Sequence, residues 1–151
     1  MNIKIKNAKP TSKEVSLLSD ELHTELEQFY GKGVIESFHE ENKEMLIFYV
    51  AYDDRETAVA CGALKHFAES TAEIKRMYVK KEFRGLGISK TLLTKLEQYA
   101  KELHYQRLVL ETGLKQPEAM NLYRAYSYTP IKCYGKHADD PDSRCFEKNI
   151  N

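Results

Sequence analysis

The stretch MYVKKEFRGLGISKTLL, residues 77–93, decides the fold. It begins as an extended apolar segment, passes through charged residues to two glycines, and ends in a run with helical spacing. Glycines are needed for sharp turns, so a turn that binds nothing is one interpretation. However, Gly85 and Gly87 also stand just before a helix N-terminus, where unpaired N–H groups and the helix dipole favour an anion. The loop is therefore a candidate phosphate site.

Two nucleotide-binding motifs are close to this loop but differ from it in spacing. A dinucleotide loop needs a third glycine where Lys90 stands, and it begins at the strand end, whereas residues 80–83 intervene here. Glu111 would match the acid on the next strand of that motif, but one domain of this length has no room for the usual second half. The P-loop pattern is not found. A nicotinamide or flavin site is the weaker alternative.

Length and composition limit the classes of function. We expect one domain over residues 1–151, long enough to bury a core. Basic and acidic residues number 23 each, so no overall charge favours nucleic acid or an anionic membrane. The longest apolar run, residues 45–52, is too short to cross a bilayer, and the first ten residues lack a signal-peptide core. We expect a cytoplasmic protein without nucleic-acid or membrane partners.

The cysteines and histidines show no metal-ligand spacing, so no metal site is expected. The three cysteines, Cys61, Cys133 and Cys145, are interpreted as the reduced thiols that are usual in the cytoplasm. Cys133 and Cys145 could face each other across the last hairpin. There we expect small packing residues rather than nucleophiles.

Hydrophobic periodicity and turn residues divide the chain into strands and helices. Thr11 and Glu14 have the spacing of a capping box at the start of the first helix. Strands are expected at residues 3–6, 45–53, 57–66, 71–79, 107–111, 129–134 and 144–148, and helices at residues 11–29, 88–103 and 117–126, with a polar connector at 34–44. This order predicts antiparallel strands first, parallel pairing where helices intervene, and thus a mixed α/β sheet.

The loop RGLGIS at residues 84–89 resembles the acyl-CoA pyrophosphate loop of the GNAT superfamily of N-acetyltransferases. The segment QPEAMNLY at residues 116–123 is similar to the N-x-x-A-x-x-L-Y helix of that family, and the element order from residue 45 onward also matches. Small stand-alone bacterial members look most similar. The resemblance implies an α+β-like GNAT fold, with a central twisted sheet of seven strands flanked by about four helices and splayed at the acyl-CoA site.

Acetyl-CoA is the cosubstrate that the resemblance implies. Strand residues Met77 to Val79 would offer main-chain groups to the pantetheine, and the glycine loop would hold the pyrophosphate. Ser89, Gln116 and Ser127 replace the Gly or Ala, the Asn and the Gly that the family carries there. The full set of implied acetyl-CoA-binding residues is Met77, Tyr78, Val79, Arg84, Gly85, Leu86, Gly87, Ile88, Ser89 and Gln116.

Acetyl transfer to an amine needs a base for the ammonium proton and an acid for the departing thiolate. Glu73 matches the position of the catalytic carboxylate in the histone-acetyltransferase branch, and Tyr123 matches the tyrosine that protonates CoA. Strand alternation places Glu73 and Met77 on one side of their strand. A surface carboxylate and a packing tyrosine are the alternative interpretations. Glu111 is the reserve base or a ligand of the substrate amine.

The resemblance implies an acceptor that is a primary amine of a small molecule or peptide, and we expect it to attack the thioester directly in a ternary complex. Tyr30, Arg76, Glu111 and Tyr134 are the candidate substrate residues, and Arg76 could hold a carboxylate. An acyl-CoA-binding sensor of the same fold, without turnover, is the second hypothesis. The presence of Glu73 and Tyr123 argues against it. Dimers are common among similar proteins, so a homodimer is the oligomer to test.

Overall fold

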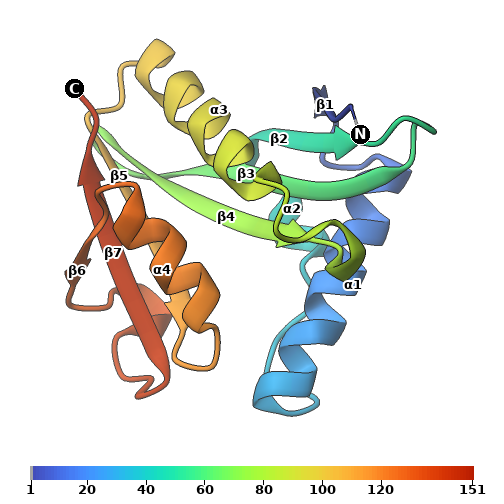
Figure 1. Cartoon of the computed structure of the whole chain (residues 1–151). Coiled ribbons are helices and arrows are strands. Elements are labelled where there is room, and N and C mark those ends of the chain that lie inside the picture. The colour runs from blue at the N-terminus through green and yellow to red at the C-terminus, as the bar shows by residue number, and fades with distance from the viewer. Residues whose placement is uncertain (1) are drawn as a thin grey trace.

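The seven strands form one sheet in the order β1-β2-β3-β4-β5-β7-β6 in the computed structural model, which describes residues 2–151 (Figure 1). Every neighbouring pair is antiparallel except β4 and β5, which run parallel. The mixed seven-stranded sheet expected from the sequence is thus confirmed. The strands are β1 (Lys4–Ala8), β2 (Met45–Tyr52), β3 (Ala58–Ala68), β4 (Thr71–Val79), β5 (Arg107–Gly113), β6 (Thr129–Ile131) and β7 (Ser143–Asn149).

Four α-helices flank the sheet: α1 (Lys13–Tyr30), α2 (His39–Asn42), α3 (Ile88–Glu102) and α4 (Pro117–Ala125). The cap of α1 lies one residue later than the predicted capping box. Ser12, rather than Thr11, is the N-cap, and its hydroxyl accepts the backbone N–H of Val15 at 3.3 Å. The Ser12 N–H donates to Lys9 O at 3.0 Å, and this turn sets where the helix begins. Within residues 2–151, no helix is both long and apolar enough to cross a membrane.

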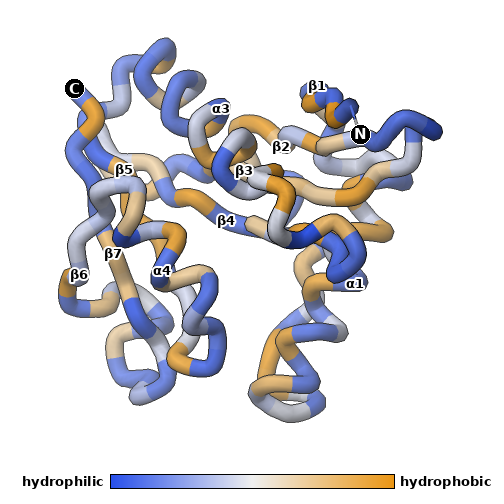
Figure 2. The backbone as a smooth tube through the Cα atoms, in the orientation of Figure 1, coloured by the Kyte–Doolittle hydropathy of each residue, from blue (hydrophilic) through white to orange (hydrophobic). Residues whose placement is uncertain are grey.

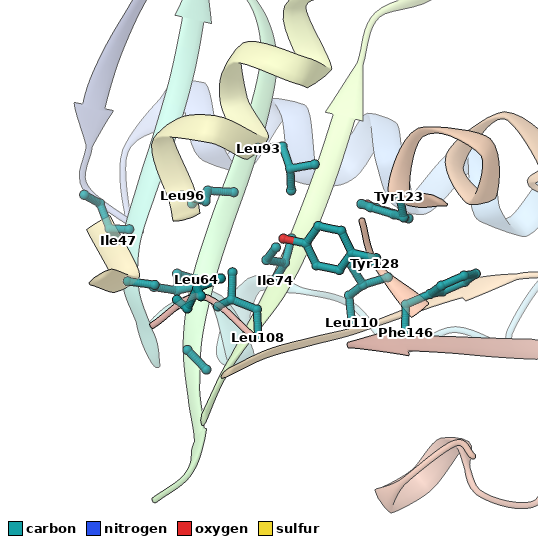
Figure 3. Close-up of a cluster of buried hydrophobic side chains, with 13 residues drawn as sticks. Ile47, Leu64, Ile74, Leu93, Leu96, Leu108, Leu110, Tyr123, Tyr128 and Phe146 are labelled. Carbon is teal, nitrogen blue, oxygen red and sulfur yellow. The ribbon is translucent and has the colours of Figure 1, made fainter. Parts of the chain in front are cut away.

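The helices lie on both faces of the sheet. Leu93 and Leu96 of α3 pack with Leu64 and Ile74 in the largest buried cluster, on the face that α3 and α4 cover (Figures 1 and 3). Leu18 of α1 belongs to a second cluster with strand residues of the opposite face. Figure 2 shows hydrophobic residues along the central strands and hydrophilic ones on the outer turns. A sheet covered on both faces explains the apolar runs in its strands.

The parallel strands β4 and β5 part after a short paired segment. Pairing covers Thr71–Glu73 against Arg107–Val109 and stops there. Beyond that point β4 continues along β3 as far as Val79, whereas β5 continues along β7 as far as Gly113. We call this opening, between residues 74–79 of β4 and 110–113 of β5, the fork. It is the splay that the sequence predicted, and Figure 1 shows the two strands diverging.

A β-bulge in β4 corrects the predicted orientation of Glu73. Arg76 and Met77 together oppose Gly62, and Arg76 has a positive φ of 59°. The extra residue reverses the alternation, so Ile74 and Met77 both pack on the α3 side. Glu73 points to the α1 and α2 face, and its expected location on the same side as Met77 was wrong.

The expectation of three reduced thiols was also wrong. Cys133 and Cys145 form a disulfide beside the β6–β7 pair, and Cys61 is a buried free thiol. Ile131 of β6 lies opposite Cys145 in the register, which leaves Cys133 just beyond the strand end. The Cα atoms of the two cysteines are 5.1 Å apart, within the range of disulfides. Composition alone could not show this proximity.

Candidate active site

The glycine loop presents a row of free backbone donors. Gly85 and Gly87 have positive φ values of 80° and 81°, and Gly87 is the N-cap residue of α3, with no side chain capping the helix. Among the described residues, the N–H groups of residues 85–90 donate to no protein acceptor. Converging N–H groups at a helix N-terminus favour an anion. The loop can therefore hold phosphate through its main chain.

Arg84 points toward α1. Its Nε donates to Val79 O at 2.8 Å, and its Nη2 donates to Glu25 Oε1 at 2.7 Å. Lys80 beside it lies 3.4 Å from Glu21 of the same helix. These contacts fix the loop against α1, so the free donors of the site are the amides. Lys81 and Lys90 are exposed and form no ion pair within residues 2–151.

The edge of β4 that faces the fork has no partner strand from Ile74 to Val79. The side chains of this segment are already engaged elsewhere. Met77 packs against Gly62 and Leu96, and the Tyr78 hydroxyl donates to Glu21 at 3.2 Å. What β4 offers to the fork is consequently its main chain, which could pair with an extended amide-containing ligand.

Tyr123 lies in the core that α3 and α4 cover. Its side chain is 5% exposed, and its ring packs edge-on to Tyr128 and tilted to Phe146 (Figure 3). Its hydroxyl makes no hydrogen bond with any residue that the structure describes. Burial, with a smaller effect from the Glu111 charge, raises the pKa of Tyr123. The phenol is therefore protonated at neutral pH and can donate.

Glu73 lies at the last paired position before the fork opens and is buried. Its Oε2 accepts a hydrogen bond of 2.9 Å from the Tyr134 hydroxyl, and its Oε1 lies 3.9 Å from Lys75 Nζ. The Tyr134 ring packs on Phe67, with centroids 4.8 Å apart. Burial, followed by the Glu73 charge and hydrogen bond, raises the pKa of Tyr134. The carboxylate of Glu73 is thus oriented by a phenol that stays protonated.

Glu111 has no close cation. Ser143 Oγ donates to its Oε2 at 2.9 Å, and His137 Nε2 lies 3.8 Å from its Oε1. Burial raises the pKa of Glu111 to about 7, although the Ser143 hydrogen bond and the Lys75 charge oppose this. Burial also lowers the pKa of His137, so the imidazole is neutral near pH 7. Glu111 is therefore a carboxyl group that can exchange a proton at physiological pH.

Arg76 is not free to hold a carboxylate of a substrate, contrary to the suggestion from the sequence. Its Nη2 donates to Glu41 Oε1 at 2.6 Å, its Nε donates to Asn42 Oδ1 at 2.9 Å, and its guanidinium lies over the Phe38 ring. Glu41 also lies 3.2 Å from Lys75. These neighbours lower the pKa of Glu41 despite the opposing effect of burial. The carboxylate partner of Arg76 is thus an internal one.

Tyr30 closes one side of the site. The hydroxyl donates to Gln116 Oε1 at 3.4 Å and accepts the Lys115 N–H at the same distance. A Cβ on Gly113 would overlap the Tyr30 hydroxyl, so the close approach needs a glycine there. Gln116, a predicted acetyl-CoA residue, therefore contacts the C-terminal end of α1.

The predicted residues thus divide between the two faces of the fork. The side of α3 and α4 carries Met77, Tyr123 and the glycine loop, and the opposite side carries the carboxylates with Tyr134. Sequence reasoning did not identify Lys75, Glu41, His137 and Ser143 as members of the site, since no motif marks them. Two cavities have volumes of about 240 and 320 Å³: the first lies at the disulfide and reaches Ser143, and the second lies at the β1–β2 edge. No cluster of metal ligands occurs within residues 2–151.

A comparison with family profiles identifies the protein family. The profile of the acetyltransferase (GNAT) family matches residues 13–128, which include the glycine loop, the fork and Tyr123. The chain belongs to the acetyltransferase (GNAT) family. The resemblance deduced from the loop and the α4 motif is thereby confirmed.

Relatives of this GNAT chain cover it to different extents. An IAA acetyltransferase of Azospirillum brasilense is 35% identical over 95 residues, 62% of each chain. An uncharacterised N-acetyltransferase of Bacillus subtilis, YsnE, is 29% identical over 90% of this chain and 91% of its own length. The matched segment spans less than two thirds of the first relative and of a fission-yeast N-acetyltransferase, where it covers 55%.

Solved structures of the family match nearly the whole GNAT chain. A Klebsiella pneumoniae protein described as an acyl-CoA N-acyltransferase has a TM-score of 0.84, 26% identity, and coverage of 99% and 98%. The PaiA N-acetyltransferase of Thermoplasma acidophilum, solved in complex with coenzyme A, has a TM-score of 0.73 and 20% identity, with 99% of each chain covered. The overall fold of this chain is thus shared by both.

Proposed function

We propose that the protein is an acetyl-CoA-dependent N-acetyltransferase that acts on a primary amine of a small molecule or peptide. The observation that carries this proposal is the fork itself. It opens between two strands, with an unpartnered row of N–H groups at residues 85–90 on one side and the carboxylates Glu73 and Glu111 on the other. Amides suit a pyrophosphate, and carboxylates suit an ammonium that must lose a proton.

The free donors of the loop fit the anionic end of acetyl-CoA. The amides of residues 85–90 would bind the pyrophosphate, with Lys81 and Lys90 close in sequence to add positive charge. Arg84 would stabilise the loop from the α1 side, through Glu25, rather than contact phosphate. The unpaired edge of β4 would bind the pantetheine amides as an added strand would. A thioester in the fork supplies the acetyl group.

Chemistry at the fork needs one base and one acid. Glu73 would accept the proton of the ammonium, directly or through water, because Tyr134 orients its carboxylate at the point where the strands part. Tyr123 would protonate the departing thiolate, since its hydroxyl is protonated and has no partner among residues 2–151. Direct attack of the amine on the thioester involves no covalent acetyl-enzyme intermediate, so the proposal assigns no nucleophilic residue.

The comparisons support acyl transfer more strongly than any particular acceptor. The names of the related proteins point to different acceptors. One is an IAA acetyltransferase and another is an N-acetylaspartate synthetase, whereas the name of the PaiA N-acetyltransferase gives no acceptor. Coenzyme A is bound in the PaiA structure. These names differ in what is acetylated, so the acceptor has to be inferred from the side chains of this chain.

Titration with acetyl-CoA, followed by measurement of thiol release over a panel of amines, tests the proposed function. Release that depends on both substrates supports it. Binding of acetyl-CoA without release for any amine would favour the sensor alternative. A thermal shift with NADH or FAD but none with acetyl-CoA would reject the proposal and revive the nicotinamide or flavin site.

A further inference from the structure

The cations beside the carboxylates of the fork are already paired within the protein. Arg76 and Lys75 both contact Glu41, at 2.6 and 3.2 Å. Lys65 lies 3.0 Å from the same carboxylate. Burial lowers the pKa of His137, so this imidazole carries no charge near pH 7. No cation of this group is left to bind the carboxylate of a substrate.

Unlike these cations, the two carboxylates of the fork are not both paired with an opposite charge. Glu73 has Tyr134 and Lys75 as partners, whereas the polar partners of Glu111 within residues 2–151 are the Ser143 hydroxyl and the neutral His137. The charges that act on Glu111 from neighbouring elements are Lys75, Asp140 and Glu73, and the hydroxyls on which its own charge acts are those of Tyr30, Tyr123 and Tyr134. Asp140 and Glu73 repel a carboxylate here, and Lys75 attracts it without forming an ion pair with it, so Glu111 has no lysine or arginine in contact within residues 2–151.

The two carboxylates lie on the same face of the fork. Glu73 pairs with Val109, and Glu111 follows two residues later on β5. Residues i and i+2 of a strand share a face, so Glu111 points to the side of Glu73, away from Leu110 in the α3 core. One strand spacing and two residues of rise separate the two Cα atoms by about 8 Å before the strands diverge. That spacing suits two cationic groups on a short chain.

A second observation marks the fork as a ligand site, apart from its acidic residues. Tyr123 is 5% exposed, yet its hydroxyl has no hydrogen-bond partner within residues 2–151. No fully buried side-chain polar atom within residues 2–151 lacks a partner, so the oxygen of this otherwise buried side chain is accessible and can bind a polar group of a ligand. The charge of Glu111 acts on this hydroxyl, which places both groups around the same opening.

We propose that the acceptor is a short aliphatic diamine without a carboxylate group, whose reacting amine meets Glu73 while its second ammonium binds Glu111. This inference rests on the proposed acetyltransferase function. A diamine supplies a cation in contact with Glu111, whereas an amino acid would bring a carboxylate to two acidic residues whose neighbouring cations, Lys75 and Arg76, are already paired.

The reaction balances with the groups at hand. Glu73 takes one proton from the reacting ammonium, and the neutral nitrogen forms a bond to the thioester carbonyl carbon. The carbon–sulfur bond then breaks, and the thiolate receives the Tyr123 proton. The acylated nitrogen loses its second proton to the Tyr123 phenolate, directly or through water, which restores the phenol and leaves the first proton on Glu73. The second ammonium stays protonated on Glu111 throughout, so the product is a monoacetylated diamine and free thiol.

Three acceptors built on a chain of four carbons test the inference. In 1,4-diaminobutane, butylamine and 4-aminobutanoate the second group is cationic, absent and anionic. We expect kcat/KM to be at least tenfold higher for the diamine than for butylamine, and the amino acid to be the poorest. An equal or higher value for 4-aminobutanoate would overturn the inference. If butylamine supports thiol release as well as the diamine does, the inference fails but the proposed acetyltransferase function is still supported. The failure of the inference can therefore be distinguished from the failure of the proposed function.

The Glu111→Gln variant tests the residue. We expect it to lose at least tenfold in kcat/KM for 1,4-diaminobutane and much less for butylamine, so that the preference disappears. The exposed carboxylate Glu102 at the end of α3 provides the control, and Glu102→Gln should keep the preference. A preference retained in Glu111→Gln would refute the assignment of the second ammonium to this residue.

Proton release provides a readout that does not depend on turnover. Near pH 6.5 part of Glu111 is protonated, because its pKa is about 7. A bound ammonium would favour the carboxylate, so titration of 1,4-diaminobutane without acetyl-CoA should release protons. Calorimetry in two buffers of different ionisation enthalpy measures this release. Absence of release in the wild type, or equal release in Glu111→Gln, would contradict the proposal.

Discussion

At the scale of single residues, Glu73 and Glu111 are the same side chain in two surroundings. Glu73 accepts the Tyr134 hydrogen bond and lies near Lys75, whereas Glu111 has Ser143 and no cation. Burial without a compensating charge raises the pKa of Glu111 to about 7. The two carboxylates are therefore suited to different tasks, one to a fixed orientation at the fork and one to pairing with a cation.

The Glu73→Gln variant should lose turnover but keep its affinity for acetyl-CoA. An amide of the same size can still accept the Tyr134 hydrogen bond, but it cannot take a proton. We expect kcat to fall by roughly 10² to 10⁴, the usual contribution of general acid–base catalysis. Thiol release measures kcat, and calorimetry with acetyl-CoA provides the control. An unchanged kcat would transfer the base role to Glu111 or to water.

Glu111 also makes the stability depend on pH. Its pKa rises from 4.5 in the unfolded chain to about 7, so between these values the folded state binds more protons. Stability therefore falls as pH rises through this window and is level above it, by at most about 3 kcal/mol. Urea denaturation from pH 4.5 to 8 should show that Glu111→Gln lacks this fall and is the more stable protein at pH 8. Parallel curves for the two proteins would contradict the assignment.

At the scale of elements, the glycine loop depends on its backbone. Gly87 has a φ of 81°, and a Cβ there would meet no protein atom within 4 Å. Gly87→Val should therefore cost about 1–2 kcal/mol through backbone strain, and it should lower acetyl-CoA affinity at least tenfold if the proposed pyrophosphate site is correct, since the Cβ would lie between the loop amides and the phosphate.

Gly33→Val is the matched control for this change, because Gly33 also has a positive φ, of 79°, and open space. It should lose similar stability and keep its acetyl-CoA affinity. Calorimetry with acetyl-CoA, together with urea denaturation, separates the two effects. Equal loss of affinity in both variants would show that strain, and not the loop, is responsible.

The disulfide links the β6–β7 hairpin next to the site. Cys145 lies opposite Glu111 in the β5–β7 register, and Cys133 precedes Tyr134. Closing a loop with a sequence separation of 12 residues stabilises the fold by about 3 kcal/mol. We expect dithiothreitol to lower the free energy of unfolding of the wild type by about this amount and to leave Cys133→Ser unaffected. A wild type insensitive to reductant would contradict this.

At the scale of the whole molecule, the sequence predicted the elements with periodic or motif signals. The strands, the parallel pair and a splay beside the glycine loop follow from alternation and from the family pattern, and the structure places the start of the splay after residue 73. The bulge at Arg76 could not be predicted, because it depends on tertiary pairing with Gly62. The partner of Arg76 was missed for a similar reason. Glu41 comes from a polar connector without periodicity, whose position is set only when α2 packs on the sheet.

Glu41 therefore has the largest structural role of the residues that the sequence did not reveal. It joins α2 to β3 through Lys65 and to β4 through Lys75 and Arg76. Contacts with these cations lower the pKa of Glu41 below its ordinary 4.5. A carboxylate whose folded pKa is lowered contributes stability above its unfolded pKa, and this is lost as pH falls below about 4.5.

The Glu41→Gln variant should be destabilised at pH 7 by about 3 kcal/mol, because the buried Arg76 loses its anionic partner. It should also lose less stability than the wild type when the pH falls below about 4.5, since the titrating group is gone. Urea denaturation at pH 7 and pH 4 measures both effects. Glu40→Gln is the control, because its partner Lys43 is exposed, and an ion pair at the surface contributes less than about 1 kcal/mol. Equal losses in the two variants would mean that the contact between α2 and the sheet does not depend on the charge of Glu41.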